Sequence, residues 1–562
     1  MATHNIDAIV IGSGITGGWA AKELSEKGLK TLLLERGPMV EHRRDYVTEG
    51  RGSHDLPYRG QWPPEAQHEK RFTHTSPVVG PANYHFFNDD RKNPYVNNEE
   101  TPFNWVRSDI FGGRSVVWGR QCYRWSDIDF EANKKDGHGI DWPIRYRDIE
   151  PWYSYVEKFA GISGERLGLR QLPDGEFLPP VELSIAEKHF KRAVAEHFDG
   201  RVVTVGRTAN LTEAKPEQGR GKCMNRAQCD RGCSFGAYFS TQSSTLPAAI
   251  ATGNLTVKTE VLVESLEHDA ESGRIIGVRT IDVNTKERSV YRSRIVFLCA
   301  SAVASTQVLL HSKSAAAPNG LGNNHDILGR YVMDHTFGTG ATGVLPGYTE
   351  FVEYGRRPTG MYVPRFRNLD GQESGTNFVR GYNFQSWGEG RMPPADHGGF
   401  GAELKAKLRV PGPWRLPLHA FCEILPRKEN RMMLDERQTD RFGIPQMKFD
   451  VVFRDNELNM LADATDQAVK MLEAAGCTQI EKRATPYPPG SGIHEMGGAR
   501  MGDDPRESVL NSWNQLHDAP NLFVTDGSAM TSASCVNPSI TYMALTARAA
   551  DHAVELLKEN QL

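Results

Sequence analysis

Short apolar runs alternate with glycine turns at the start of the chain. Asp7–Ile11 and Thr31–Glu35 carry unbroken apolar stretches of strand length, and between them Thr16–Lys27 has the pattern of a helix that ends at Gly28. Continuous apolar runs are typical of strands buried on both faces, and the order strand, helix, strand predicts a parallel sheet.

The later pattern predicts a second type of architecture. Residues 38–105 are polar and weakly periodic, which indicates a long excursion over the surface or over a ligand. Residues 340–455 mix strand-like runs with many glycines and prolines. We therefore expect an α/β chain, with a second, α+β domain built on an antiparallel sheet. Further elements are predicted as helices within 141–163, near 243–252 and near 458–475, and as strands at 255–258, 275–279 and 295–299.

Composition limits the function classes. The chain has 562 residues and a net charge of −4, from 66 basic and 70 acidic side chains, which argues against a protein held on nucleic acid by bulk charge. No window reaches the roughly 18 apolar residues that span a bilayer. The first apolar run has no basic segment before it and leads into glycines, so we expect no transmembrane segment and no export signal on this chain.

The first glycine turn carries a dinucleotide motif. Gly12, Gly14 and Gly17 form G-x-G-x-x-G directly after a strand, and Glu35 closes the next strand. The first glycine permits the tight turn, the second lets a pyrophosphate approach the backbone, and the third lets the helix pack closely. An acid at position 35 suits the ribose hydroxyls of an adenosine. The alternative is a glycine turn without a ligand, and the motif alone does not separate FAD from NAD.

Three of the eight cysteines are clustered. Cys223, Cys229 and Cys233 are spaced C-x5-C-x3-C. Three thiolates suit an iron–sulfur cluster better than tetrahedral zinc, which needs a fourth ligand. The alternatives are a disulfide plus a free thiol, or a loop that has lost its ligand.

The C-terminal third carries the most specific motifs. His494 lies in H-x-x-G-G-x-x-M-G, and Asp526-Gly527 and Asn537-Pro538 follow before a terminal helix. With the N-terminal fingerprint, the Gly112-Gly113 loop, the segment from Ala300 to Gln307 and Asn430-Arg431, this order resembles the glucose–methanol–choline (GMC) family of flavin oxidoreductases along the whole chain.

The resemblance implies a Rossmann-like FAD-binding domain that binds FAD in an extended form. In related fungal pyranose oxidases a histidine in the glycine loop carries the flavin covalently, whereas the matching position here is Val117, so noncovalent FAD is expected. The residues expected at the cofactor are Gly12, Gly14, Ile15, Thr16, Gly17, Glu35, Arg36, Gly112, Gly113, Ser115, Trp118, Leu262, Ala300, Ser301, Asp526, Gly527, Asn537 and Pro538.

By the same resemblance, His494 is the general base that takes the proton of the substrate hydroxyl, and Asn537 hydrogen-bonds and orients that hydroxyl. The adjacent C–H delivers a hydride to flavin N5. These residue types fit, because a neutral imidazole accepts a proton near pH 7 and an amide holds an oxygen without competing for the proton. No other of the 18 histidines is singled out.

A narrower resemblance points to a substrate class. The segments GWAAKEL from Gly18, WGRQ from Trp118, YRWSD from Tyr123, WPIRY from Trp142 and RGCSFGAY from Arg231 are similar to bacterial glucoside 3-dehydrogenases. This implies oxidation of the C3 hydroxyl of glucosides or disaccharides. It also implies a small helper subunit with an export signal, a cytochrome c acceptor, and a periplasmic location if the chain is exported with its partner, otherwise a cytoplasmic one.

The cysteine spacing is similar to that of bacterial FAD glucose dehydrogenases, where it holds a [3Fe-4S] cluster that takes electrons from the flavin. The lack of a nearby fourth cysteine favours three irons over four. Two alternatives stay open: another flavin enzyme of the family, acting on gluconate, glucose or a non-sugar alcohol or using O2 without a cluster, and a non-enzymatic carrier that holds FAD as a structural element.

The expected domains are discontinuous in the sequence. Residues 1–125, 200–335 and 485–562 are assigned to the FAD-binding domain, which includes the cysteine loop. Residues 126–199 and 336–484 are assigned to the substrate-binding domain.

Overall fold

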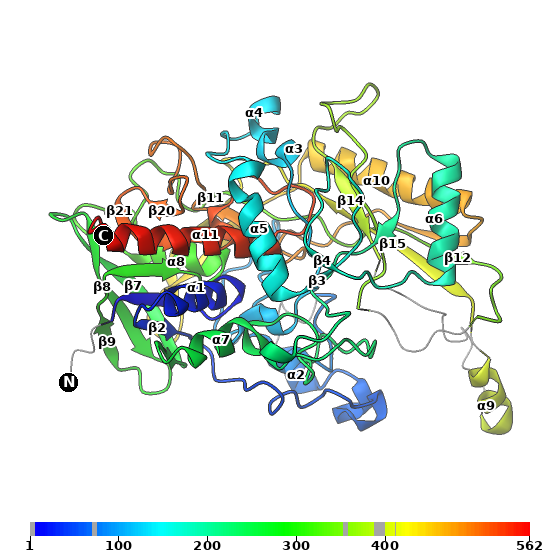
Figure 1. The fold of residues 1–562 in the computed structure, drawn as a ribbon, viewed down its shortest axis with the longest axis horizontal. Coiled ribbons are helices and arrows are strands. Elements are labelled where there is room, and N and C mark those ends of the chain that lie inside the picture. Colours follow the sequence, from blue (N-terminus) through cyan, green and yellow to red (C-terminus); the bar gives the residue numbers. More distant parts are fainter. Residues whose placement is uncertain (1–5, 70–75, 352–357, 387–399, 411) are drawn as a thin grey trace.

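The computed structural model describes residues 6–69, 76–351, 358–386, 400–410 and 412–562. A parallel sheet with its helices occupies one side of the molecule, and an antiparallel sheet occupies the other (Figure 1). This arrangement confirms the expected fold class, a Rossmann-like α/β domain joined to an α+β domain on an antiparallel sheet.

The parallel sheet has six strands in the order β20-β21-β10-β1-β2-β6, of which the edge pair β20-β21 is antiparallel. Its centre is buried on both faces, because Ile9 and Ile11 join one hydrophobic cluster while Ala8 and Val10 join another. The strands are β1 (Ala8–Ile11), β2 (Thr31–Leu34), β6 (Leu255–Lys258), β10 (Ile295–Leu298), β20 (Gln515–Leu516) and β21 (Ala519–Val524).

Four helices pack at this sheet. Helix α1 (Ile15–Glu26) contacts α7 (Thr245–Ala251) and the terminal α11 (Ser539–Lys558), and α11 contacts α5 (Tyr146–Ala160) (Figure 1). The helices predicted within 141–163 and near 243–252 are thus α5 and α7.

The second six-stranded sheet is antiparallel throughout, in the order β18-β12-β15-β14-β13-β5. Helix α10 (Asp455–Ala474) packs on β12 and β15, and α6 (Ile185–His197) packs beside α10. The strands are β5 (Thr204–Val205), β12 (Thr339–Leu345), β13 (Met361–Val363), β14 (Tyr382–Gln385), β15 (Trp414–Cys422) and β18 (Thr478–Arg483).

Smaller sheets and helices complete the fold. A three-stranded sheet holds β7 (Val261–Asp269), β8 (Arg274–Asp282) and β9 (Arg288–Tyr291), and a four-stranded sheet holds β17 (Pro445–Asp450), β16 (Arg431–Thr439), β11 (Arg330–Met333) and β19 (Met496–Gly498). The remaining elements are α2 (Pro64–Glu69), α3 (Asp127–Phe130), α4 (Ala132–Asp136), α8 (Ala302–His311), α9 (Gly401–Arg409), β3 (Ile162–Ser163) and β4 (Phe177–Leu178).

The domain limits remain a proposal. Strand β5 falls in the segment 200–335 assigned to the FAD-binding domain, yet it pairs with β13 in the antiparallel sheet. Across the described ranges, no helix combines the length and apolar character needed to cross a membrane.

Candidate active site

The turn between β1 and α1 is closely packed except at one glycine. Gly12 has a φ of +95°, and a Cβ on Gly17 would lie 1.8 Å from the Gly12 carbonyl oxygen, so both positions require glycine. A Cβ on Gly14, in contrast, would meet no atom of the described residues within 4 Å. Gly14 is the N-cap of α1, so the open space lies at the helix N-terminus, where backbone N–H groups favour a phosphate.

Glu35 follows β2 and is fixed by its neighbours. Its Oε2 accepts hydrogen bonds from Ser13 Oγ at 2.5 Å and Ser13 N at 3.1 Å, and its Oε1 accepts from Gly37 N at 2.8 Å. Burial raises the pKa of the carboxyl, and these hydrogen bonds oppose the rise. Ser13 Oγ also accepts from Gly112 N at 2.8 Å, which ties the second glycine loop to the first.

The second glycine loop lies against the first. Gly112 and Gly113 have φ values of +94° and +53°, and a Cβ on Gly113 would lie 3.2 Å from Gly14 Cα. Ser115 Oγ donates to Gly112 O at 2.6 Å and stabilises the turn. Residues about a hundred positions apart in the sequence therefore form one continuous wall.

These loops line a cavity of about 740 Å³, within the size range of cofactor sites. The polar excursion of residues 38–105 covers part of it, through Pro77, Val78, Phe87 and Trp105. Of the residues expected at the cofactor or the substrate, the cavity is lined by Gly12, Gly14, Ile15, Thr16, Glu35, Arg36, Gly113, Ser115, Trp118, Leu262, Ala300, Ser301, His494, Asp526, Gly527 and Asn537.

Three expected residues lie behind the cavity wall. Gly17 packs on the Gly12 carbonyl, and a Cβ on Gly112 would meet the side chain of Gln242 at 2.8 Å. Pro538 precedes the first residue of α11 as its N-cap. These positions shape the wall and do not face the cavity.

His494 and Asn537, the two catalytic residues that the resemblance implies, lie together on the cavity wall. Asn537 Nδ2 lies 3.2 Å from His494 Nε2. Burial, together with the neighbouring His335 and Arg114, lowers the pKa of His494 well below its usual 6.5. The imidazole is therefore neutral at physiological pH, with a lone pair available to take a proton.

The charged and acidic side chains around His494 have partners. Arg114 Nη2 lies 2.8 Å from Glu495 Oε2. Asp334 accepts backbone hydrogen bonds from Gly492 N at 3.0 Å and His494 N at 2.9 Å, which fix the turn that carries the histidine. Burial and the nearby Glu495 raise the pKa of Asp334 to about 7.

Several further residues lie at this end of the cavity, outside the motifs recognised in the sequence. His335 Nδ1 lies 2.9 Å from His494 Nδ1, and Gln385 Nε2 donates to Asn537 Oδ1 at 2.6 Å. Phe337 and Phe421 line the cavity beside them, with ring centroids 5.5 Å apart. An Asp-His pair directly after a buried apolar run was a signal for His335, whereas Gln385 had none.

The cysteine loop lies beside the cavity. Cys229 lines it, Cys223 and Cys233 do not, and all three thiols are free and half-buried. Burial raises the pKa of Cys223, and the nearby thiols of Cys229 and Cys233 add to the rise. Within the described residues, no group of three His, Cys, Asp or Glu side chains converges on a single metal ion.

Comparison with known proteins identifies the family. Family models described as GMC oxidoreductase match residues 6–337 and 426–546. The chain is 27% identical over 565 residues to 2-methyl-1,2-propanediol dehydrogenase of Mycolicibacterium austroafricanum, covering 97% of this chain and 94% of the relative. It is 26% identical over 583 residues to the fructose dehydrogenase large subunit of Gluconobacter japonicus, covering 99% of each.

Two further comparisons cover a part of the chain and its fold. A C-glycoside 3-oxidase of Microbacterium trichothecenolyticum is 26% identical over 294 residues, 50% of this chain and 51% of the relative. The crystal structure of a pyridoxine 4-oxidase from Mesorbium loti superposes with a TM-score of 0.61 at 17% identity, over 98% of this chain and 99% of that one. The family models span most of the sequence, and this chain belongs to the GMC oxidoreductase family.

Proposed function

We propose that this chain is an FAD-dependent dehydrogenase that oxidises a secondary hydroxyl, at C3, of glucosides or disaccharides to the keto sugar. In this proposal the electrons leave through a [3Fe-4S] cluster to a cytochrome c. The observation that carries the proposal is the pair formed by His494 Nε2 and the Asn537 amide, 3.2 Å apart on the wall of the large cavity.

The residues present fit FAD. Gly14 leaves room for a pyrophosphate that a Cβ would fill, and the buried Glu35 carboxylate lies at the end of the neighbouring strand. The two glycine loops, Asp526-Gly527 and Asn537 would hold the cofactor. When bound, FAD supplies the acceptor for the hydride that leaves the substrate carbon.

The chain's own residues supply the proton chemistry. The substrate hydroxyl displaces the contact between His494 and Asn537, donates its proton to His494 Nε2, and accepts a hydrogen bond from Asn537 Nδ2. Loss of the hydroxyl proton and of the C–H hydride leaves a C=O, so the substrate loses two electrons. A low pKa of His494 keeps the base unprotonated before the sugar arrives.

A sugar fits the lining at this end. Phe337 and Phe421 offer apolar ring faces for the C–H surface of a pyranose, and Gln385 lies among the polar groups that suit its hydroxyls. The names of the relatives agree in chemistry, since they include a fructose dehydrogenase large subunit and C-glycoside 3-oxidases.

The cysteine loop supports the electron route. Each thiolate of an iron–sulfur cluster binds a different iron, so the three sulfurs need not converge on one point. Cys229 lines the cavity that would hold the flavin, so a cluster bound by this loop would lie beside the source of electrons. Relatives described as a large subunit and as a flavoprotein of gluconate 2-dehydrogenase support the existence of partner subunits. The proposed small subunit would carry the export signal and would give the complex a periplasmic location.

Anaerobic mixing with candidate substrates tests the proposal. The FAD-loaded protein is mixed with methyl glucoside, cellobiose, lactose or gluconate, flavin bleaching is followed, and the product is identified by NMR. We expect bleaching by the glucosides and a 3-keto product. No bleaching by any glucoside, with FAD bound, would refute the substrate class.

The alternative is another GMC enzyme, including an O2-using sugar oxidase without a cluster, and the relatives named as oxidases favour testing it. Reduced protein mixed with air distinguishes the two. An oxidase reoxidises its flavin rapidly with O2 and contains no iron, whereas the proposed dehydrogenase contains iron and reacts slowly with O2.

A further inference from the structure

A chain of hydrogen bonds runs through the catalytic pair from a backbone carbonyl. His335 Nε2 lies 2.9 Å from Ser534 O, and His335 Nδ1 lies 2.9 Å from His494 Nδ1. His494 Nε2 then contacts Asn537 Nδ2 at 3.2 Å, and Asn537 Oδ1 accepts from Gln385 Nε2 at 2.6 Å. This hydrogen-bond chain therefore spans four side chains from four separate parts of the sequence.

The hydrogen bond between His335 and the Ser534 carbonyl determines which atom donates in the next bond of the series. A carbonyl oxygen only accepts, so His335 carries its proton on Nε2 and donates it to Ser534 O. In a neutral imidazole the other nitrogen is then an acceptor, so His335 Nδ1 receives the proton of His494 Nδ1. This leaves the lone pair of His494 on Nε2, the nitrogen that faces Asn537 and the cavity.

The surroundings of His335 favour its neutral form. Its side chain is fully buried, and burial holds the pKa of its imidazole at about 4. A protonated His335 would carry a proton on both nitrogens and would oppose the Nδ1 proton of His494. The acidic side chains next to the two histidines in the sequence are also engaged: Asp334 accepts from backbone N–H groups, and Glu495 pairs with Arg114.

We propose that His335 is a positioning residue that fixes the tautomer and ring orientation of His494, so that the lone pair of the base points into the cavity. The proposal rests on the proposed role of His494 as the base. Without His335, the ring could carry its proton on Nε2 and would have no lone pair facing the substrate. The second histidine thus acts on the base and not on the sugar.

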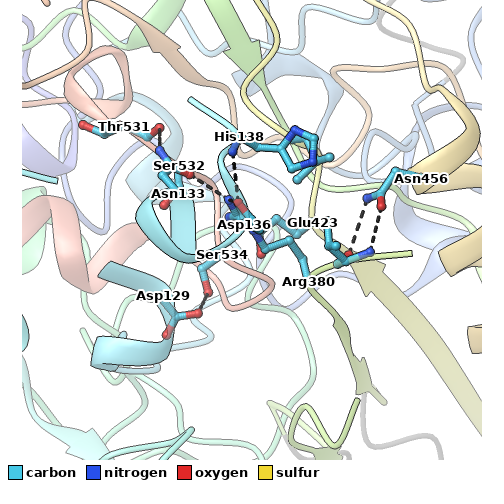
Figure 2. Close-up of polar contacts among 12 residues, drawn as sticks. Asp129, Asn133, Asp136, His138, Arg380, Glu423, Asn456, Thr531, Ser532 and Ser534 are labelled. Atoms are coloured by element: carbon cyan, nitrogen blue, oxygen red, sulfur yellow. Dashed lines mark hydrogen bonds and ion pairs between the residues drawn. The ribbon is translucent and has the colours of Figure 1, made fainter. Parts of the chain in front are cut away.

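The Ser534 carbonyl, at which the hydrogen-bond chain begins, lies in a loop held by buried contacts. Ser534 has a φ of +55°, and its Oγ donates to Asp129 Oδ1 at 2.6 Å (Figure 2). Two residues earlier, Ser532 Oγ accepts from Trp142 Nε1 at 2.8 Å. A serine in the left-handed region costs backbone strain, and these buried contacts offset it.

The Gln385 end of the hydrogen-bond chain is connected to the same loop that carries Ser534. Asn133 Nδ2 donates to Thr531 O at 3.0 Å, and Asn133 Oδ1 accepts from Arg380 Nη2 at 2.8 Å (Figure 2). Arg380 also pairs with Asp136 and with Glu423, and it lies just before β14, the strand that carries Gln385. One buried polar cluster therefore holds both the Ser534 carbonyl and the strand that orients Asn537.

Matched variants test the role of His335. His335→Leu keeps similar volume but offers no acceptor to His494, whereas His335→Gln offers an amide oxygen to His494 and an N–H to Ser534 O. We expect the flavin-bleaching rate with saturating methyl glucoside to fall roughly 10- to 100-fold in His335→Leu, as with other orienting partners of histidine. His335→Gln should recover most of the rate, and the Kd for the sugar should change little in both.

A second readout needs no turnover. In protein labelled with 15N-histidine, the signal lost in His494→Ala identifies the base, and its nitrogen shifts report which nitrogen carries the proton. We expect the proton on Nδ1 in the wild type and in His335→Gln, and a mixture of tautomers in His335→Leu.

The inference would be overturned by a wild-type His494 protonated on Nε2, or by equal bleaching rates in His335→Leu and the wild type. Equal losses in the Leu and Gln variants would also overturn it, because they would indicate a packing role. A failure of the proposed function gives a different result, because glucosides would then not bleach the flavin of the wild type. The tautomer measurement would still decide the role of His335.

Discussion

Substitution of Gly14 by alanine separates cofactor binding from folding. The added Cβ meets no described atom within 4 Å, and the φ of −66° is open to alanine. The remaining cost is that of alanine at a helix N-cap, about 0.5–1 kcal/mol. The unfolding free energy of the apoprotein should therefore fall by no more than about 1 kcal/mol. The same Cβ occupies the proposed pyrophosphate space, so the Kd for FAD should rise at least about tenfold, or about 1.4 kcal/mol.

Gly17→Ala is the matched control, because its Cβ would lie 1.8 Å from the Gly12 carbonyl oxygen. That clash should destabilise the apoprotein itself by about 3 kcal/mol. Urea unfolding of the two apoproteins measures the first effect, and titration of flavin fluorescence measures the second. A Gly14→Ala protein that binds FAD with wild-type affinity would refute the assignment of this turn to the pyrophosphate. A loss of apoprotein stability equal to that of Gly17→Ala would refute the packing argument.

Three further predictions concern the catalytic end and the cysteine loop. His494→Ala should bind FAD normally but slow flavin bleaching by glucosides about 10²- to 10⁴-fold in stopped flow, and an unchanged rate would exclude it as the base. Burial, His335 and Arg114 hold the pKa of His494 well below 6.5, so the base stays neutral as the pH falls to 6.5. The bleaching rate should therefore stay level down to pH 6.5 and drop only at lower pH. A rate that is half-maximal near pH 6.5 would contradict this prediction. Cys229→Ser should keep FAD and glucoside-driven bleaching but lose iron in metal analysis, and full iron content would exclude the proposed cluster.

The parts of the site that could be predicted from the sequence lie in short motifs of neighbouring residues. The strand, glycine turn and helix around Gly14 follow from local apolar pattern and from backbone needs of the turn, and the structure has them where the sequence indicates. His494 and Asn537 are only 43 residues apart and lie in motifs flanked by glycines and a proline. We expect these two residues at one site because their motifs resemble those of the GMC family, and their spacing alone does not predict that they meet.

The residues that the sequence did not identify depend on pairing between distant strands. His335 is 159 residues from His494, and Gln385 is 152 residues from Asn537. Gln385 lies on β14, which pairs with β15 in the antiparallel sheet, and no local pattern in residues 340–455 encodes that register or the approach of Asn537. Figure 2 shows the same dependence, since Asn133 and Arg380, far apart in the sequence, contact each other beside the loop that contains Thr531 and Ser534.

The most direct test of the proposed function uses methyl glucoside carrying deuterium at a single carbon. Flavin bleaching is followed anaerobically in stopped flow for sugar labelled at C3 and, separately, at C2. We expect slower bleaching for the C3-labelled sugar and an unchanged rate for the C2-labelled one, because the C3 hydrogen leaves as the hydride. Slowing by C2 label alone, or no bleaching by either sugar, would contradict oxidation at C3.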